Sequence, residues 1–435
     1  MKITVIGSGY VGLVSGICFA KLGHDVICVD NNESKISQLE SGIIPIFEPG
    51  LAELLKEVSD SGKISFTTNL KDALKTSNTI FIAVGTPQDE KGAADLSYVF
   101  AVANEIAQHS DSYKLIITKS TVPAGTGAQI KKLVQQTNPD LDFSVASNPE
   151  FLREGAAISD FTNPDRIVVG IEDEKSRQIF SDIYASFPKE KVIYSDIITA
   201  ELIKYASNSF LATKISFINE MADLCEIVGG DIKSLSNAMG LDSRIGEKFL
   251  NPGPGFGGSC FPKDIMAIVN VAKENKVSLS LIESVITSNN YRKIKMADKI
   301  SAALNGEING KKITLLGLAF KANTDDIRYS PATVIAEELE KKGAKVFAHD
   351  PEAIENSKRE LAELENIQFC ENIDTAIQDT DLIVIATEWK EYRDLDWEKV
   401  KKLTNARKIV DLRNLFDAVK MKNSGFEYFY IGGKA

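Results

Sequence analysis

Near its start the chain reads Ile3-Thr4-Val5-Ile6-Gly7-Ser8-Gly9-Tyr10-Val11-Gly12. The first four residues predict a buried strand, and a glycine-rich turn leads from it into a helical segment. Glycines at these positions permit a tight turn and let a pyrophosphate approach the N–H groups at the helix N-terminus. Asp30 ends the next predicted strand, where its carboxylate can accept hydrogen bonds from ribose hydroxyls and disfavours a 2′-phosphate. The pattern predicts an NAD site; the alternative is a glycine-rich turn with an incidental aspartate.

Short apolar runs alternate with helical segments through the first 196 residues. Parallel strands joined by helices form a sheet that is covered by helices on both faces. The runs that predict buried strands are residues 3–6, 26–29, 79–84, 115–118, 143–146 and 167–169.

The rhythm changes at residue 197, where a long helical stretch begins that is apolar around most of its circumference and ends near residue 228. Such a helix is expected to be buried between domains or subunits. A loop rich in glycine and proline, residues 251–258, follows, and further helical sequence continues to about residue 305.

A second set of strands echoes the first. Residues 313–317 repeat the pattern of residues 3–7, and Asp350 ends a strand as Asp30 does. We therefore expect an α/β chain with two Rossmann-like doubly wound parallel-sheet domains joined by a central helical region. Its expected parts are an NAD-binding domain (1–196), the central region with a cysteine loop and a dimer interface (197–305), and a second Rossmann-like domain (306–435).

The second repeat has no third glycine, which argues against another pyrophosphate site of the first type. Lys321 follows its first strand at the edge where doubly wound sheets bind ligands. This lysine is expected either to hold a different anionic group or to be an ordinary solvated side chain.

Composition excludes several classes of protein. The 435 residues include 50 Lys and Arg against 61 Asp and Glu, a net charge of -11, which disfavours nucleic acid as the main ligand. The five cysteines are far apart and the three histidines are dispersed, so neither a disulfide framework nor a metal site is expected. Glycines interrupt the apolar N-terminal run, and no apolar run approaches the ~18 residues of a membrane span. We expect a cytoplasmic protein without a membrane partner.

Cys260 lies in a setting typical of a nucleophile. It follows a glycine-rich loop, and Lys263 and Asp264 come three and four residues later. Nearby positive charge favours a thiolate, and the four-residue spacing places Asp264 on the face of Cys260 if a helix begins there. A buried structural cysteine is the alternative.

Two further groups of polar residues are candidates for the site. Lys204 and Asn208 share one face of the long apolar helix, where they suit an anion or a developing oxyanion, although a helix lysine is usually solvated. The segment Asn148-Pro149-Glu150-Phe151-Leu152-Arg153-Glu154-Gly155 closes a predicted strand and so faces the cofactor crevice, unless it is a solvated loop.

Together these motifs resemble the UDP-glucose/GDP-mannose dehydrogenase family over nearly the whole chain. The segments that carry the resemblance are Gly7-x-Gly9-x-x-Gly12, Gly85-Thr86-Pro87, residues 120–126 (STVPAGT), 148–155 (NPEFLREG), 251–264 (NPGPGFGGSCFPKD), 317–321 (GLAFK) and 325–331 (DDIRYSP).

The resemblance implies a four-electron oxidation of a nucleotide sugar's primary alcohol to a carboxylate, with two NAD. Cys260 would form a thiohemiacetal and then a thioester, which water hydrolyses. Lys204 and Asn208 would stabilise oxyanions, Asp264 would assist hydrolysis, and Thr118 and Glu154 would position water or act in acid–base steps.

The resemblance also implies the binding residues. Cofactor contacts would come from Gly7, Gly9, Tyr10, Val11, Gly12, Asp30, Lys35, Thr86, Thr121, Glu154, Lys263 and Arg328. Substrate contacts would come from Glu150, Phe151, Leu152, Arg153, Glu154, Lys204, Asn208, Phe249, Leu250, Asn251, Pro252, Gly253, Gly257 and Lys321. Arg244 is similar to an arginine supplied across a subunit interface, which implies a homodimer through the central helix, with residues 306–435 binding the nucleotide sugar.

The segment 258–264 looks like the glucose branch of the family rather than the acetamido-sugar branch, and GDP-mannose is the second choice of substrate. Two alternatives stay open. A non-catalytic NAD-binding regulator would bind NAD without turnover, and a simple two-electron alcohol dehydrogenase would release an aldehyde with one NADH per sugar.

Overall fold

The computed structural model describes residues 1–89, 92–404 and 406–433. It divides the chain into two compact units, Met1–Ser207 with Met266–Val277 and Asn208–Ile265 with Ser278–Ala435. Two helices, α9 (Ile197–Val228) and α11 (Phe261–Glu274), each pass from one unit to the other. The division into three domains stays a prediction.

In the described residues, the first unit is built on an eight-stranded sheet with the order β3-β2-β1-β4-β5-β6-β7-β8. Strands β1 to β6 are parallel, and the chain crosses over after β3 to start the second half beside β1. The strands are β1 (Lys2–Ile6), β2 (Asp25–Val29), β3 (Ile64–Thr67), β4 (Thr79–Ile82), β5 (Lys114–Thr118), β6 (Phe143–Ser147), β7 (Ile167–Gly170) and β8 (Val192–Ser195). This is the predicted doubly wound arrangement.

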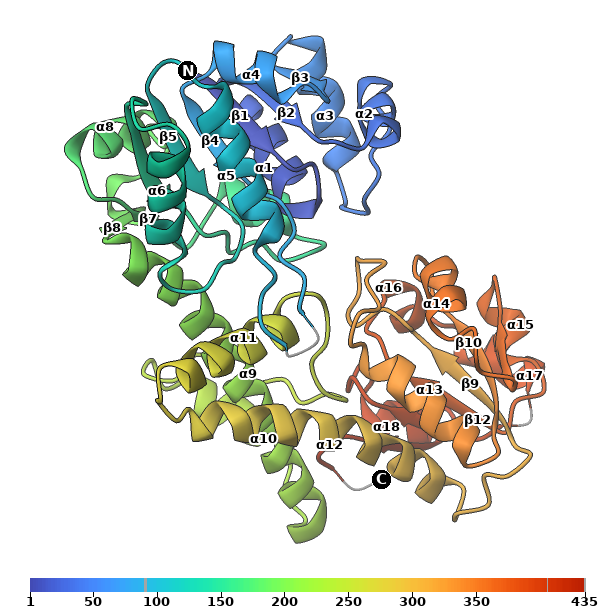
Figure 1. The fold of residues 1–435 in the computed structure, drawn as a ribbon. Coiled ribbons are helices and arrows are strands. Elements are labelled where there is room, and N and C mark those ends of the chain that lie inside the picture. Colours follow the sequence, from blue (N-terminus) through green and yellow to red (C-terminus); the bar gives the residue numbers. More distant parts are fainter. Residues whose placement is uncertain (90–91, 405, 434–435) are drawn as a thin grey trace. The chain divides into compact units, whose positions relative to one another are not determined.

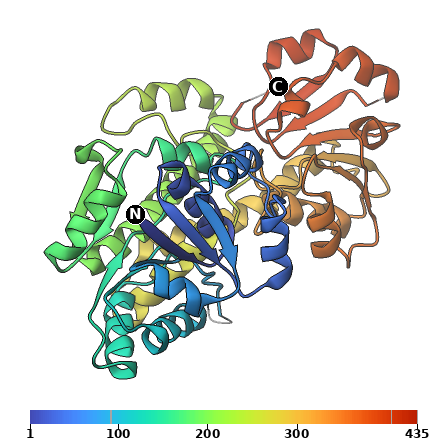
Figure 2. The ribbon, with the colours of Figure 1, turned by 90° about the horizontal axis from the view of Figure 1, so that it is seen from above.

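Helices cover both faces of this sheet, as Figures 1 and 2 show. Successive residues of a strand point to opposite faces: Phe81 packs into a core with α1, whereas Ile80 and Ile82 pack into a second core with α5. The helices are α1 (Tyr10–Lys21), α2 (Glu33–Glu40), α3 (Leu51–Asp60), α4 (Leu70–Thr76), α5 (Ser97–His109), α6 (Thr126–Thr137), α7 (Ala157–Thr162) and α8 (Glu174–Ile183), with a short 3₁₀ turn at Lys189–Lys191.

The last two strands differ from the all-parallel sheet that the sequence predicts. β7 runs antiparallel to β6, and the two strands meet only at Ser147 and Gly170. Pro149 has no N–H and cannot continue a ladder beyond β6. The side chain of Asn148 instead donates to the carbonyl of Val168, 2.7 Å away, and joins the end of β6 to β7.

The second unit contains α10 (Ile232–Gly240), α12 (Ser280–Ala303) and, in the described residues, a six-stranded parallel sheet with the order β11-β10-β9-β12-β13-β14. Its strands are β9 (Lys312–Leu316), β10 (Lys345–His349), β11 (Ile367–Phe369), β12 (Leu382–Ile385), β13 (Lys408–Asp411) and β14 (Glu427–Tyr430). The helices around it are α13 (Pro331–Lys341), α14 (Ile354–Glu360), α15 (Ile373–Ile377), α16 (Lys390–Arg393), α17 (Trp397–Leu403) and α18 (Ala418–Asn423).

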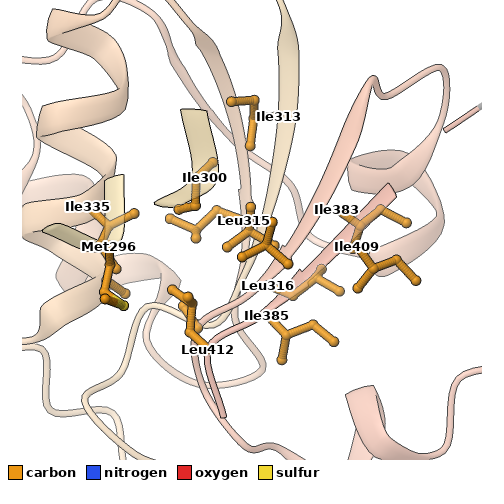
Figure 3. Close-up of a cluster of buried hydrophobic side chains, with 14 of the residues drawn as sticks. Met296, Ile300, Ile313, Leu315, Leu316, Ile335, Ile383, Ile385, Ile409 and Leu412 are labelled. Atoms are coloured by element: carbon orange, nitrogen blue, oxygen red, sulfur yellow. The ribbon is translucent and has the colours of Figure 1, made fainter. Parts of the chain in front are cut away.

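One hydrophobic core ties α12 to this second sheet. Met296 and Ile300 of α12 lie among Leu315, Ile335 and Leu412 (Figure 3). Each side chain of this size contributes about 1.5–3 kcal/mol when it is fully buried. The helix is therefore held on the same rigid body as the sheet.

Side chains of Thr387 and Asp350 contact the glycine turn that follows β9 in the second sheet. A Cβ on Gly317, which has φ +103°, would collide with Thr387. The Asp350 carboxylate already accepts hydrogen bonds from the N–H groups of Leu318 (2.7 Å) and Ala319 (3.0 Å) and from the indole of Trp389 (3.1 Å). The expected absence of a second pyrophosphate site of the first type stays a prediction.

Candidate active site

The glycine-rich turn after β1 has the shape that a dinucleotide requires. Gly7 has φ +98°, and a Cβ there would lie 2.7 Å from the carbonyl oxygen of Ala83. A Cβ on Gly12 would collide with the carbonyl of Gly7, whereas one on Gly9 would meet no atom within 4 Å. Gly9 is the N-cap residue of α1, so open space lies beside the N–H groups of that helix end. A pyrophosphate fits this position.

Asp30 is held as a carboxylate at the end of β2. Its Oδ2 accepts hydrogen bonds from the Ser8 N–H at 2.8 Å and from Lys35 Nζ at 3.0 Å, and its Oδ1 accepts from the Asn32 N–H. Burial opposes the charge, but these donors together keep the pKa of Asp30 below its ordinary value. Lys35, a predicted cofactor residue, is thereby fixed beside Asp30.

The carboxyl ends of β4 and β5 bring two more predicted cofactor residues together. The hydroxyl of Thr86 donates to the carbonyl of Thr121 at 3.0 Å. Thr118, at the end of β5, is fully buried, and its hydroxyl donates to the carbonyl of Ala146 at 3.2 Å. The structure therefore gives Thr118 a contact within the sheet, and its role toward water stays a prediction.

Glu150 and Lys204 form a buried ion pair, with 2.8 Å between Oε1 and Nζ. Burial disfavours the charged form of Glu150, but Lys204 and the Leu152 N–H, which donates at 2.6 Å, hold its pKa below the ordinary value. Phe151 is flanked by cations, with Arg166 3.4 Å and Lys204 5.5 Å from the ring centroid. This cluster can receive an anionic or polar group next to a positioned ammonium.

A third cation, Lys119, belongs to the same cluster and was missed by the sequence analysis. Its Nζ donates to the carbonyl oxygen of Asn148 at 3.3 Å and to Oδ1 of the same residue at 3.2 Å. Burial lowers the pKa of Lys119 to about 8, although the nearby Glu150 opposes the shift. A lysine directly after a strand in the segment KSTVP is the only signal that could have suggested it.

Glu48 is another residue that the sequence analysis missed. Its buried carboxylate accepts hydrogen bonds from the hydroxyl of Tyr10 and from the N–H groups of Gly155 (2.7 Å) and Ala157 (2.8 Å). It therefore ties the start of α1 to the segment that carries Glu154, which is itself half-buried. Nothing in the spacing of the sequence pointed to Glu48, because its partners are about 40 and 110 residues away.

Arg153 is engaged within its own segment. Its guanidinium makes a bidentate pair with Asp160, and its backbone N–H donates to the same carboxylate. The side chain is mostly exposed, at 60%. Its predicted contact with substrate would have to compete with this pair.

Cys260 lies at the N-terminus of α11. The Asp264 N–H donates to the Cys260 carbonyl at 2.9 Å, which makes Cys260 the N-cap residue. Helix N-termini favour a thiolate over a thiol. In the described part of the chain the other four cysteines are buried, whereas Cys260 is partly exposed. Burial raises the pKa of Cys18 and of Cys28 to about 12, so these two thiols stay protonated.

Asp264 contacts one predicted catalytic residue, Asn208, and one predicted cofactor residue, Lys263. Its Oδ2 accepts a hydrogen bond from Asn208 Nδ2 at 2.7 Å, and its Oδ1 lies 2.8 Å from Lys263 Nζ. A helix does begin at Phe261, which is the condition for Asp264 to share the face of Cys260, and Asp264 lies one turn after Cys260. The network can position a polar group or water near the sulfur.

Side chains of α9 and α12 hold the loop that precedes Cys260. Asn219 accepts from the Gly253 N–H at 2.8 Å, and Arg292 donates to the Gly253 carbonyl at 3.0 Å. Asn289 bonds both the N–H and the carbonyl of Phe256. The predicted substrate residues Phe249, Leu250, Asn251, Pro252, Gly253 and Gly257 all belong to this loop. The three anchoring residues carried no motif and were not predicted.

The remaining predicted residues of the second unit are more exposed. Arg244 is 87% exposed and pairs with its neighbour Asp242. Lys321 is half-buried, with Nζ 5.2 Å from the ring centroid of Phe320. Arg328 is 61% exposed and pairs with Asp326.

The predicted site residues fall into two groups, one in each compact unit. The first unit contains the residues of the glycine turn, Asp30, Lys35, Thr86, Thr118, Thr121, residues 150–154 and Lys204. The second unit contains Asn208, Arg244, residues 249–264, Lys321 and Arg328. Across the described ranges no group of His, Cys, Asp or Glu could hold a metal ion, and no described helix is long and apolar enough to cross a bilayer.

Comparisons with known proteins all match one family. Models described as the UDP-glucose/GDP-mannose dehydrogenase family match the chain: the NAD binding domain at residues 1–188, the central domain at 198–291 and the UDP binding domain at 314–418. A UDP-glucose 6-dehydrogenase of Rhizobium meliloti (strain 1021) is 48% identical over 437 residues, which cover 99% of each chain.

Two solved structures extend the comparison. A UDP-glucose dehydrogenase from Pyrobaculum islandicum is 37% identical with a TM-score of 0.91, and the match covers 100% of this chain and 98% of that one. A UDP-D-ManNAc dehydrogenase from Pyrococcus horikoshii is 30% identical with a TM-score of 0.86, and the match covers 99% of each.

Proposed function

Because the chain belongs to the UDP-glucose/GDP-mannose dehydrogenase family, we propose that it oxidises UDP-glucose to UDP-glucuronate through thiohemiacetal and thioester intermediates on Cys260. The observation that carries the proposal is the position of Cys260 at the N-terminus of α11, one turn before the Asp264–Asn208 pair. NAD, bound at the glycine turn, supplies two successive hydride acceptors.

The chemistry balances with residues of this chain. Removal of a hydride and a proton from the C6 alcohol leaves an aldehyde, and the Cys260 thiolate adds to it to form a thiohemiacetal. Loss of a second hydride and a proton gives a thioester. Water then attacks the thioester carbonyl, the C–S bond breaks, and the carboxylate leaves with the thiolate restored. Each cycle releases two NADH per sugar.

Several polar side chains of the chain would support these steps. The Lys204 ammonium and the Asn208 amide would stabilise oxygen anions on the reacting carbon, since both are positioned by a carboxylate partner. Asp264 would accept a proton from the attacking water. Glu154 is the candidate for proton transfer in the first oxidation, and Thr118 is the candidate for positioning water.

The choice of UDP-glucose rests on the relatives. Proteins named for that activity share 48% and 37% identity with this chain, against 30% for the protein named for an acetamido sugar. Residues 314–418, which match the UDP binding domain, would hold the nucleotide, with Lys321 as a phosphate contact. GDP-mannose or another UDP-sugar is the second candidate.

A homodimer would form through α9. In the single chain this helix exposes Phe210 (65%), Leu224 (50%) and Ile227 (77%), with Phe217 and Val228 on the same stripe. Phe210, Phe217 and Leu224 recur every seven residues, close to two helical turns, and therefore share one face. Exposed apolar faces of this kind mark protein contacts, and a second copy would bring its Arg244 to the substrate site.

We also infer a cytoplasmic location. The five cysteines are all free, as expected for a reducing compartment. A cell-fractionation experiment with an antibody against the native chain would place it; recovery outside the cytoplasm would contradict this inference.

The first experiment measures NADH formed per UDP-glucose consumed by the purified protein in excess NAD, with the product identified by mass. Two NADH per sugar and UDP-glucuronate are expected. One NADH with a free aldehyde would indicate a two-electron dehydrogenase. If UDP-glucose gives no NADH but GDP-mannose is turned over, the substrate is GDP-mannose. NAD binding without turnover of any nucleotide sugar would indicate a non-catalytic regulator.

Cys260→Ser tests the covalent step in the same assay. It is expected to abolish UDP-glucuronate formation and to leave NAD binding within about twofold of the wild type, because the thiol is not part of the glycine turn. Cys225→Ser, at a buried cysteine of the same unit, is the matched control. Wild-type production of UDP-glucuronate by Cys260→Ser would contradict the mechanism.

A further inference from the structure

Asp326 links the loop that carries Cys260 to the side chain of Arg328. Its carboxylate is buried, with 7% of the side chain exposed. Oδ2 accepts a hydrogen bond from the Ser259 N–H at 3.1 Å and another from Arg328 Nη2 at 2.9 Å. Oδ1 accepts from Arg328 Nε at 2.8 Å and from the Arg328 N–H at 2.9 Å.

Backbone contacts reinforce this link. The Gly258 N–H donates to the Arg328 carbonyl at 2.7 Å, so two successive amides, those of Gly258 and Ser259, are bound to the segment 326–328. A Cβ on Gly257 would lie 2.5 Å from the carbonyl oxygen of Tyr329, so this loop packs directly against the same segment. The residue that follows these anchored amides is Cys260.

The Asp326 carboxylate accepts hydrogen bonds from both the Ser259 N–H and the Arg328 guanidinium. Toward the loop, Oδ2 holds the peptide between Gly258 and Ser259, one residue before Cys260, and so restricts the backbone that carries the thiol. Toward the solvent, both oxygens hold the Arg328 guanidinium by its Nε edge in a bidentate pair. The guanidinium stays 61% exposed, and is therefore oriented in advance for an anion.

We propose that Asp326 is a positioning residue that holds the Cys260 loop and the Arg328 guanidinium in one fixed arrangement. The effect on Cys260 is independent of the reaction, and the effect on an anionic cofactor rests on the proposed function. Without the carboxylate, the Ser259 amide loses its acceptor, and the thiol spends less of its time at the N–H groups that start α11.

The test measures the rate at which iodoacetamide alkylates Cys260, followed by mass of the cysteine peptide as a function of pH, in the full chain without cofactor or substrate. Asp326→Asn replaces one of the two accepting oxygens by an NH2 donor, so residue 326 can no longer accept all of these hydrogen bonds from Ser259 and Arg328. The variant is expected to raise the pH of half-maximal alkylation by at least about half a unit, because the loosened loop weakens the helix-end stabilisation of the thiolate. The matched control is Asp325→Asn, which removes an equal charge from the neighbouring residue, whose carboxylate accepts from Asn356 instead. Removing negative charge alone favours a thiolate, so the control is expected to shift the midpoint down or leave it unchanged.

Equal midpoints in Asp326→Asn, Asp325→Asn and the wild type would overturn the proposal. If Asp326→Asn does not fold, as judged by its thermal melting, Asp326→Glu decides. That variant keeps the charge but displaces it by one methylene, and an upward shift supports the proposal whereas a wild-type midpoint contradicts it. In NADH production, Asp326→Asn is expected to lower kcat by about tenfold and to raise KM for NAD. If the wild-type protein makes no NADH, the proposed function is contradicted but the role of Asp326 is not. The alkylation profiles of the wild type and the variants still test that role.

Discussion

Lys204 Nζ lies 2.8 Å from Glu150 Oε1, and both side chains are 4% exposed. The pair joins α9 to the segment that follows β6, and it holds the Lys204 ammonium against a carboxylate. Buried charges of this kind are costly when one partner is removed, because the other is left without compensation.

Glu150→Gln is therefore expected to destabilise the fold by about 3 kcal/mol at pH 7. The pKa of Glu150 is lowered in the folded state, so its contribution is complete above the ordinary value of 4.5 and is lost as the pH falls through the lowered pKa. Urea unfolding at pH 7 and pH 4 measures both effects. The difference between wild type and variant should shrink at pH 4; a constant difference would contradict the ion-pair explanation.

Lys119 is expected to give the opposite pH dependence. Its pKa is lowered to about 8 from an ordinary 10.5, so between these values the unfolded chain binds more protons than the folded chain. Stability should therefore rise between pH 8 and pH 10 by about 1–3 kcal/mol from this residue. Lys119→Met should reduce the rise, as urea unfolding at both pH values would show. Lys35→Met, at a partly exposed lysine, is the control and should leave the rise in place.

The glycine turn offers a matched pair of substitutions. Gly9→Ala should fold with an unchanged melting temperature, because its Cβ meets open space, but should weaken NAD binding by about tenfold, because that space is where the pyrophosphate approaches. Gly12→Ala should lower the melting temperature by several degrees, since its Cβ would collide with the Gly7 carbonyl. Calorimetry and thermal melting distinguish the two. Tight NAD binding by Gly9→Ala would exclude this turn as the pyrophosphate site.

The proposed homodimer can be tested at the centre of the α9 stripe. Phe217→Glu should convert the protein to a monomer in light scattering, because a charge would be buried in an apolar contact. It should also lose NADH production, since Arg244 would no longer reach a second copy. Val419→Glu, at a 67% exposed residue of α18, is the control and should stay dimeric. A dimeric Phe217→Glu would place the interface elsewhere.

Much of the fold was predictable from sequence because its signals are local. The six predicted strands of the first half correspond to β1, β2, β4, β5, β6 and β7, while β3 and β8 were not predicted. The glycine turn, Asp30 and the helix start after Cys260 also follow from short-range rules of turn and cap chemistry. The reversed direction of β7 does not, because it depends on how Asn148 is bonded to a strand 20 residues later.

The sequence by itself determined the two doubly wound sheets and the glycine-rich turn, and it indicated Cys260 as the candidate nucleophile, because each of these signals lies in neighbouring residues. Only the tertiary structure decided how those residues are held. Glu48, Lys119, Asn289 and Arg292 lie outside the motifs of the sequence, and Asp326 lies in the segment 325–331 without a predicted role. Each of them bonds a segment that the folded chain brings to it from elsewhere in the sequence. A buried polar group needs a partner wherever the fold supplies one, and the spacing of residues along the chain does not reveal which partner that is.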